Sequence, residues 1–278
     1  MNIMTNVGSQ TAQTNMLKIS RNLNQSISRL SSGSRLTSAA DDAAGVAIST
    51  DLRAQLRGYN QAIRNANDGV AILQTAEGSY NAQAETLTRM RELAVQSSND
   101  SMTDAERAYI HEEFSSHMAE IDRVATVTEF NGLKLLTGSG ADGSGNFEFQ
   151  VGMRNSVDDR ITINMVALST GASGLAVSAA TVSTQSGAQA AIDTLDDALD
   201  GLAVQRSTLG ATINQLNSSI DNLSNTVTNV TQGNAQIQDV NVASESASFA
   251  KSQVLQQAGV AMLAQANQAP SLALRLLG

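Results

Sequence analysis

Cysteine and tryptophan are absent from the 278 residues of this chain, which also holds a single proline, three tyrosines and five phenylalanines. Without cysteine, the chain forms neither a disulfide framework nor a thiolate metal site. Catalytic and cofactor pockets are usually lined by aromatic side chains, and aromatic residues make up only 3% of this sequence, so the composition argues against an enzyme. A core must instead be built from Leu, Ile, Val, Met and Ala, which favours helices packed on helices.

Positive charge and long apolar runs are also scarce. The 17 basic and 26 acidic residues give a net charge of −9, which opposes binding to nucleic acid or to anionic lipid. No run approaches the roughly 18 apolar residues of a membrane span. The first 25 residues contain no stretch like the apolar region of a secretory signal. We therefore expect neither a nucleic-acid nor a membrane partner, and no cleavable signal peptide.

The strongest pattern is an apolar seam in the C-terminal half. Steps alternating between three and four residues from Ile192 to Ile237 meet apolar side chains almost throughout, and only Arg206 and Asn234 interrupt them. A matching stripe runs from Ile48 to Ala94. Sustained spacing of this kind is typical of long helices that face a partner helix. The two stripes are expected to bury each other in an antiparallel pair, with Arg206 as a charge inside the seam.

Shorter elements are expected between the two long helices. Thr103 and Glu106 form a capping box that begins a third helix, over about 103–128. Alternating apolar residues near 147–151 and 161–165 predict one β-hairpin, at about 146–166.

Two connecting segments are rich in small residues. Gly138 to Gly145 is expected to be a flexible turn. The short segment at about 169–189 is small and polar, and we expect it to be a variable surface excursion.

The two ends of the chain predict helices that need partners. Met16, Ile19, Leu23, Ile27 and Leu30 form one stripe near the N-terminus. The last 41 residues carry a broad stripe dominated by alanine. Such helices are marginal alone and gain burial only by packing together. The expected fold is therefore mainly α: a long antiparallel helical coiled-coil rod with a small β-hairpin, plus a terminal two-helix coiled-coil domain.

The sequence offers weak candidates for catalysis and metal binding. His111 and His117 are six residues apart, whereas a zinc-binding helix needs histidines at i and i+4. We expect His117 to be partly packed and His111 to be solvated. The acidic pairs Asp41-Asp42 and Asp196-Asp197 are poor catalytic candidates, because adjacent residues of a helix point about 100° apart and do not easily share one site. Asp41-Asp42 also stands at an expected helix start, where acids interact with the helix dipole. No catalytic, cofactor-binding or metal-binding residue is predicted, and no cofactor.

Motifs at both ends, in order, resemble bacterial flagellin. The N-terminal motifs are RLSSG at 29–33, SAADDAAG at 38–45, RNANDG at 64–69, QTAEG at 74–78, RELAVQS at 91–97 and FNGLK at 130–134. The C-terminal motifs are LGA at 209–211, QAG at 257–259 and LAQANQAP at 263–270, closing on LL at 276–277. The resemblance covers roughly residues 1–137 and 195–278.

The resemblance implies a division into two domains and a function. Residues 1–42 with 238–278 would form an inner polymerisation domain, and residues 43–237 the helical rod. The short segment 169–189 leaves no room for the outer domains of larger flagellins, so the chain is similar to a minimal flagellin. Such a protein would be a structural subunit that polymerises into the bacterial flagellar filament for swimming motility. It would be secreted unfolded by type III export.

The resemblance also implies partners and surface residues. The polymerisation helices would act through Leu23, Ile27, Leu30, Val254, Leu255, Met262 and Leu263. Arg89, Leu93 and Glu113 match the rod surface that Toll-like receptor 5 recognises, a surface that also serves contacts between subunits. Further implied partners are an export chaperone, the filament cap and the hook-filament junction proteins. An alternative interpretation is that the chain is itself a hook-filament junction protein.

Overall fold

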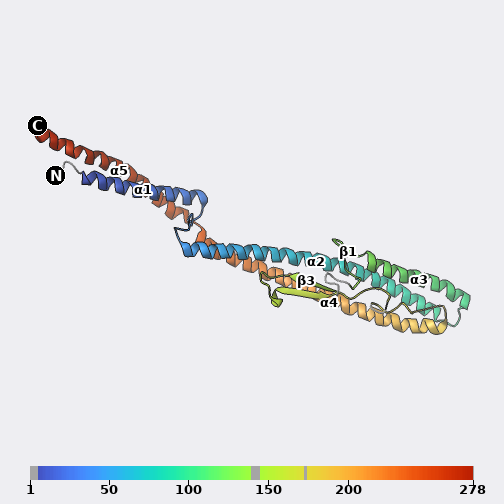
Figure 1. The fold of residues 1–278 in the computed structure, drawn as a ribbon. Helices are drawn as coiled ribbons and strands as arrows, with labels where there is room; N and C mark the ends of the chain where they lie inside the picture. The colour runs from blue at the N-terminus through green and yellow to red at the C-terminus, as the bar shows by residue number, and fades with distance from the viewer. Residues whose placement is uncertain (1–5, 139–144, 172–173, 278) are drawn as a thin grey trace. The chain divides into compact units, whose positions relative to one another are not determined.

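The computed structural model describes residues 6–138, 145–171 and 174–277 (Figure 1). The elements in chain order are the helices α1 (Val7–Ser32), α2 (Ala43–Ser97) and α3 (Asp104–Val127), the strands β1 (Glu129–Phe130), β2 (Leu133–Lys134) and β3 (Asn146–Gln150), the short 3-10 helix η1 (Val157–Asp159), the strand β4 (Arg160–Asn164), and the helices α4 (Gln185–Gln238) and α5 (Val242–Leu277). The expectation of a mainly helical protein with a small antiparallel hairpin is confirmed.

The chain divides into two compact units. Residues 1–56 and 228–278 form one, here called the terminal unit, and residues 57–227 form the other, the central unit. These limits fall inside α2 and α4, so each of the two long helices contributes to both units. The domain boundaries expected from the sequence lie near residues 42 and 238. These positions are just before the start of α2 and at the end of α4, whereas the two compact units divide inside both helices.

In the central unit, α2 and α4 run antiparallel. Arg91 contacts Asp196, and further along, Tyr59 lines the same cavity as Leu223, so residue numbers rise along one helix as they fall along the other. The predicted stripes are buried here, with the leucines at 73 and 87 of α2 and at 195, 202, 209 and 216 of α4 at most 1% exposed. Burial also raises the pKa of Tyr80 to about 12 because the phenolate would lose its hydration.

Arg206 does not lie inside the seam. The structure places it among the exposed residues of α4, between the buried residues Leu202 and Leu209. A guanidinium gains more from solvation than from burial among leucines, which explains why the helix turns this position outward. The expectation of a buried charge at this place is therefore wrong.

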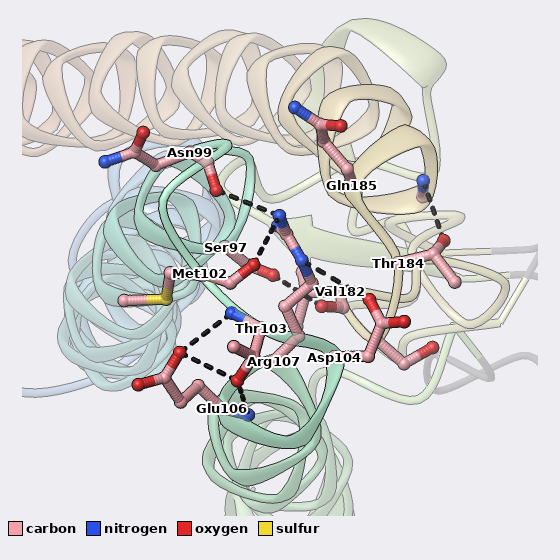
Figure 2. Close-up of polar contacts among 12 residues, drawn as sticks. Ser97, Asn99, Met102, Thr103, Asp104, Glu106, Arg107, Val182, Thr184 and Gln185 are labelled. Carbon is pink, nitrogen blue, oxygen red and sulfur yellow. Dashed lines mark hydrogen bonds and ion pairs between the residues drawn. The ribbon is translucent and has the colours of Figure 1, made fainter.

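The capping box predicted for α3 is confirmed. The Thr103 hydroxyl accepts a hydrogen bond from the Glu106 backbone N–H at 3.4 Å, and the Glu106 carboxylate accepts one from the Thr103 N–H at 2.8 Å. The same turn contains a buried cation, shown in Figure 2: the Arg107 guanidinium, 3% exposed, donates to the carbonyl oxygens of Asn99 at 2.9 Å and Met102 at 3.2 Å. Arg107 thus ties the turn after α2 to the first turn of α3.

The hairpin predicted near 146–166 is formed by β3 and β4. Phe147 pairs with Ile163, and Phe149 pairs with Ile161. All four side chains are buried, because alternate residues of a strand face the same side. Phe149 lies against α2, where a Cβ added to Gly69 would meet the phenylalanine ring at 3.0 Å.

A second, shorter hairpin was not predicted. Strands β1 and β2 pair Glu129 with Lys134 and Phe130 with Leu133. The connecting residues, Asn131 and Gly132, have φ values of 49° and 80°. Asn-Gly is the strongest short-range signal for a two-residue hairpin turn, so the sequence did contain the information.

The segment 169–189 is not a surface excursion. Val177 and Val182 are completely buried in the core of the central unit. The Asp122 carboxylate accepts hydrogen bonds from the Thr170 N–H at 2.8 Å and the Thr170 hydroxyl at 2.9 Å. The described part of this segment is therefore held to the central unit by buried side chains and hydrogen bonds, although its sequence lacks periodicity. Of the turn expected from Gly138 to Gly145, residues 139–144 lie outside the described residues.

Candidate functional site

The terminal unit consists mainly of α1 packed against α5. The Asn6 side chain donates to the Ala266 carbonyl at 2.8 Å, and the Ser9 hydroxyl donates to Asn267 Oδ1 at 2.8 Å. Near the other end of α1, the Arg29 guanidinium lies 3.9 Å from the Glu245 carboxylate. The start of α1 therefore lies beside the later part of α5, so the two helices are antiparallel.

The described side chains of this pair of helices form no buried apolar core. Every buried hydrophobic side chain among the described residues lies between Ala62 and Leu216, within the central unit. The buried side chains described in the terminal unit belong to serines, Ser9, Ser26 and Ser49, and the one other buried residue described there is Gly45. Helices that bury so little apolar area derive little stability from their own contacts.

Large apolar side chains are exposed along both helices. In α1 these include Leu17, 65% exposed, and in α5 they include Val254 at 64% and Met262 at 62%. A shallow groove of about 340 Å³ lies between the helices. It is lined by Gln13, Met16, Leu17, Ser20, Gln256 and Leu263. Contiguous exposed apolar surface of this kind is typical of a surface that another protein covers.

The residues predicted for polymerisation fall into two groups. Leu23, Leu30 and Leu263 are half-buried in the isolated chain. The other four are exposed: Ile27, Val254, Leu255 and Met262. In the second group, Val254 and Met262 are more than half exposed, and Ile27 and Leu255 are 47% and 43% exposed.

The predicted surface on the central unit contains a charged cluster. Arg89 of α2 donates to Glu113 of α3 at 2.8 and 3.2 Å, and to Glu92 at 3.0 Å. The Arg89 and Glu113 side chains are about half exposed. The hydrogen bond from Arg89 holds the pKa of Glu113 below its usual value. His117 Nε2 lies 3.7 Å from the same Glu113 carboxylate.

Leu93 does not lie on this surface. It is 1% exposed and belongs to the core of the central unit. The prediction that its side chain forms part of the surface is therefore wrong for the isolated subunit, and the accessible pair is Arg89 with Glu113. Four positions along a helix rotate a side chain by about 40°, which is enough to separate Leu93 in the buried stripe of α2 from the exposed Arg89 at its edge.

The described residues contain no group of three or more His, Asp or Glu side chains arranged to hold a metal ion. His111 is not solvated as expected: its ring stacks on Phe114 with centroids 6.5 Å apart, and its Nδ1 atom is buried. His117 is half-buried, as predicted.

The paired acids have structural partners. Asp42 Oδ1 accepts a hydrogen bond from the Gly45 N–H at 2.9 Å at the start of α2. Asp41 is bound by Thr37, whose hydroxyl lowers the Asp41 pKa. Asp196 is bound by Arg91. In the part of the chain that the structure describes, no helix combines the length and apolarity needed to cross a membrane.

These features define a class of protein: a helical structural subunit whose core lies in its central unit and whose terminal helices carry uncovered apolar side chains. The chain belongs to the bacterial flagellin family. Residues 3–141 match the bacterial flagellin N-terminal helical region, and residues 192–277 match the bacterial flagellin C-terminal helical region.

Full-length relatives agree with this assignment. The chain is 40% identical over 259 residues to a flagellin of Halalkalibacterium halodurans, which covers 92% of this chain and 93% of the relative. It is 35% identical over 282 residues to the flagellar filament 33 kDa core protein of Treponema phagedenis, with 98% of both chains covered. The protein is therefore a structural subunit of the bacterial flagellar filament, an extracellular self-assembled polymer, and not an enzyme.

Solved structures share the fold. The crystal structure of Bacillus cereus flagellin aligns with a TM-score of 0.50 at 25% identity, covering 58% of this chain and 88% of that one. A candidate flagellar hook-associated protein from Vibrio parahaemolyticus aligns with a TM-score of 0.59 at 17% identity, covering 72% and 100%. At that identity the second similarity concerns the fold alone.

Proposed function

We propose that the exposed apolar side chains of α1 and α5 are the contacts through which subunits polymerise. The observation that carries this proposal is the absence of any buried hydrophobic side chain in the described part of the terminal unit, while Val254 and Met262 are more than half exposed. Neighbouring subunits would cover these side chains, so assembly supplies the burial that the isolated helices lack. Contacts of one surface with a different surface, repeated without closing a ring, generate a helical filament.

Under this proposal, residues 1–42 with 238–278 form the inner polymerisation domain, and residues 43–237 form the rod. Leu23, Leu30 and Leu263 hold α1 and α5 together within a subunit, whereas Ile27, Val254, Leu255 and Met262 contact neighbours. The breaks in the helices between α1 and α2 and between α4 and α5, close to residues 42 and 238, support these proposed bounds.

The test compares two single substitutions in α5 of the full-length chain. Met262→Asp places a charge on the uncovered apolar surface, and Gln257→Asp places the same charge at an exposed polar position of the same helix. Filaments formed after a salt jump are counted by negative-stain electron microscopy, with helix content checked by circular dichroism. We expect filaments from the wild type and Gln257→Asp, and none from Met262→Asp.

Two outcomes contradict the proposal. If Met262→Asp forms normal filaments, its side chain is not at a subunit contact. If both variants fail equally, added charge rather than lost apolar contact blocks assembly. Short rings from the wild type would instead favour the alternative function, a hook-filament junction protein.

The proposal extends to the surface formed by Arg89 and Glu113. This half-exposed ion pair would contact a neighbouring subunit in the filament and Toll-like receptor 5 in the free subunit. A matched control exists in α3, where Arg123 bonds Glu120 at 2.7 Å and is 61% exposed. We expect Arg89→Ala to weaken binding to the receptor ectodomain and Arg123→Ala to leave it unchanged. Equal affinity of the two variants would contradict this assignment.

Further partners follow from membership of the family: an export chaperone, the filament cap and the hook-filament junction proteins. Export would use the type III route without a cleavable signal peptide. The exposed apolar side chains of α5 are chemically suited to a chaperone that holds the helix before assembly. A test is whether a purified export chaperone loses affinity for the Met262→Asp chain but not for Gln257→Asp.

A further inference from the structure

The turn between β1 and β2 contains a chemically distinctive pair of residues. Asn131-Gly132 is the one Asn-Gly sequence in the 278 residues. Both residues are exposed, and both have positive φ values, 49° and 80°. They form the two-residue connection between strands that are themselves only two residues long.

An exposed Asn-Gly pair brings an electrophile next to an unhindered nucleophile. The electrophile is the carboxamide carbon of Asn131, and the nucleophile is the backbone nitrogen of the following residue. Because glycine has no Cβ, that nitrogen is sterically accessible. Among the described residues, the Asn131 side chain and the Gly132 N–H have no hydrogen-bond partner that would restrain the reacting atoms.

We propose that Asn131 is a site of spontaneous deamidation in the folded subunit. The Gly132 nitrogen loses its proton to solvent and bonds to Asn131 Cγ; the side-chain nitrogen takes up a proton from solvent as its bond to Cγ breaks, and ammonia leaves. Water then opens the resulting five-membered imide at either of its carbonyl carbons. The products are aspartate and isoaspartate, and no oxidant or reductant takes part.

The hairpin is weakly held, which favours the backbone motion that ring closure requires. Two residue pairs connect the strands, and the side chains of the ion pair between Lys134 and Glu129, at 2.6 Å, are about half exposed. Exposed ion pairs contribute little to stability, and short solvent-exposed elements open locally at low cost. Leu135 and Leu136, completely buried just after β2, hold the base of the hairpin.

The products would change this surface. Either product adds one negative charge to each subunit. Isoaspartate also adds a carbon to the backbone of a two-residue turn, whose length fixes the strand register. The pairing of Phe130 with Leu133 would then be lost, while the buried leucines keep the segment attached. Because ring closure is spontaneous and hydrolysis to isoaspartate does not reverse it, modified turns would accumulate as a subunit ages.

The test is incubation of the folded full-length chain in mildly alkaline buffer, followed by peptide mapping with mass spectrometry. Asn155-Ser156, in the exposed loop before η1, and Asn217-Ser218, within α4, are internal controls. We expect the conversion of amide to acid to concentrate at Asn131, with both aspartate and isoaspartate present. In the Gly132→Asn variant, which tolerates positive φ but has a Cβ, conversion at Asn131 should be lost.

Three results would overturn the proposal. Asn131 could remain as fully amidated as Asn155 and Asn217. Conversion could continue unchanged in the Gly132→Asn variant. Conversion could also occur only after the chain is unfolded in urea, which would show that the folded hairpin protects the turn. Circular dichroism before and after incubation establishes that the chain stays folded.

Discussion

The guanidinium of Arg91 in α2 donates two hydrogen bonds to the carboxylate of Asp196 in α4, with N–O distances of 2.5 and 3.2 Å. This bidentate pair joins residues 105 positions apart in the chain. It connects the two long antiparallel helices of the central unit. Through these hydrogen bonds, Arg91 lowers the pKa of Asp196 below its ordinary value of 3.8.

The pair predicts a pH-dependent contribution to stability. A carboxyl group whose pKa is lower in the folded than in the unfolded state stabilises the fold above its unfolded pKa. That stabilisation is lost as the pH falls through the folded pKa. We expect Asp196→Asn to lower the free energy of unfolding at neutral pH. The difference from the wild type should shrink as the pH falls below 3.8 and vanish once the pH is below the folded pKa of Asp196.

The measurement is urea unfolding of the wild type, Asp196→Asn and Asp197→Asn at several pH values. The effect should be small because the Arg91 and Asp196 side chains are 42% and 47% exposed. Asp197→Asn removes the same charge from the exposed neighbour on α4 and is the control for the loss of a carboxylate. Identical pH profiles for the two variants would rule out a specific role for the pair.

Two glycines in α2 should respond in opposite directions to alanine. At Gly69, a Cβ would meet the buried Phe149 ring at 3.0 to 3.2 Å, so the hairpin must shift. We expect Gly69→Ala to destabilise the chain by about 1–3 kcal/mol, as overpacking does. Gly78 has no neighbouring atom within 4 Å, so Gly78→Ala should stabilise the helix by about 0.5–1 kcal/mol. Denaturant titration of both variants tests this, and a change of the same sign in both would contradict the close approach of β3 to α2.

Two aromatic residues in α3 provide a similar comparison. Phe114 is completely buried, whereas Tyr109 is 77% exposed. Phe114→Ala should reduce the free energy of unfolding by about 3–5 kcal/mol because it leaves a cavity in the core. Tyr109→Ala should change it by no more than about 0.5 kcal/mol. The midpoint of thermal unfolding distinguishes the two, and comparable losses would mean that α3 is not packed as described.

Local patterns in the sequence predicted the regular elements well. The Leu195 to Leu216 spacing predicted one long helix, Phe147 and Phe149 predicted a strand, and Thr103 with Glu106 predicted where α3 begins. These patterns succeed because helix and strand periodicity and capping depend on residues a few positions apart. The Asn131-Gly132 turn had the same kind of local signal, although the second hairpin was not inferred from it.

The candidate site was only partly predictable. The sequence identified the apolar side chains of α1 and α5, but not which of them stay uncovered: Leu263 is half-buried, whereas Met262 beside it is 62% exposed. It placed Leu93 on a surface with Arg89, although α2 turns Leu93 into the core. Neighbouring positions on a helix differ in exposure according to where partner helices lie, and that is a property of the packing.

The sequence by itself therefore determined the helical class, the antiparallel stripes and the membership of the flagellin family, since each is encoded in residue spacing and order. The tertiary structure decided the burial of Val177 and Val182 in a segment without periodicity, the outward position of Arg206 and the burial of Arg107 at the start of α3. These outcomes depend on contacts between residues far apart in the chain, or on several weak local preferences acting together. No pattern of spacing specifies them, because the free energy of each side chain is set by the neighbours that folding brings to it.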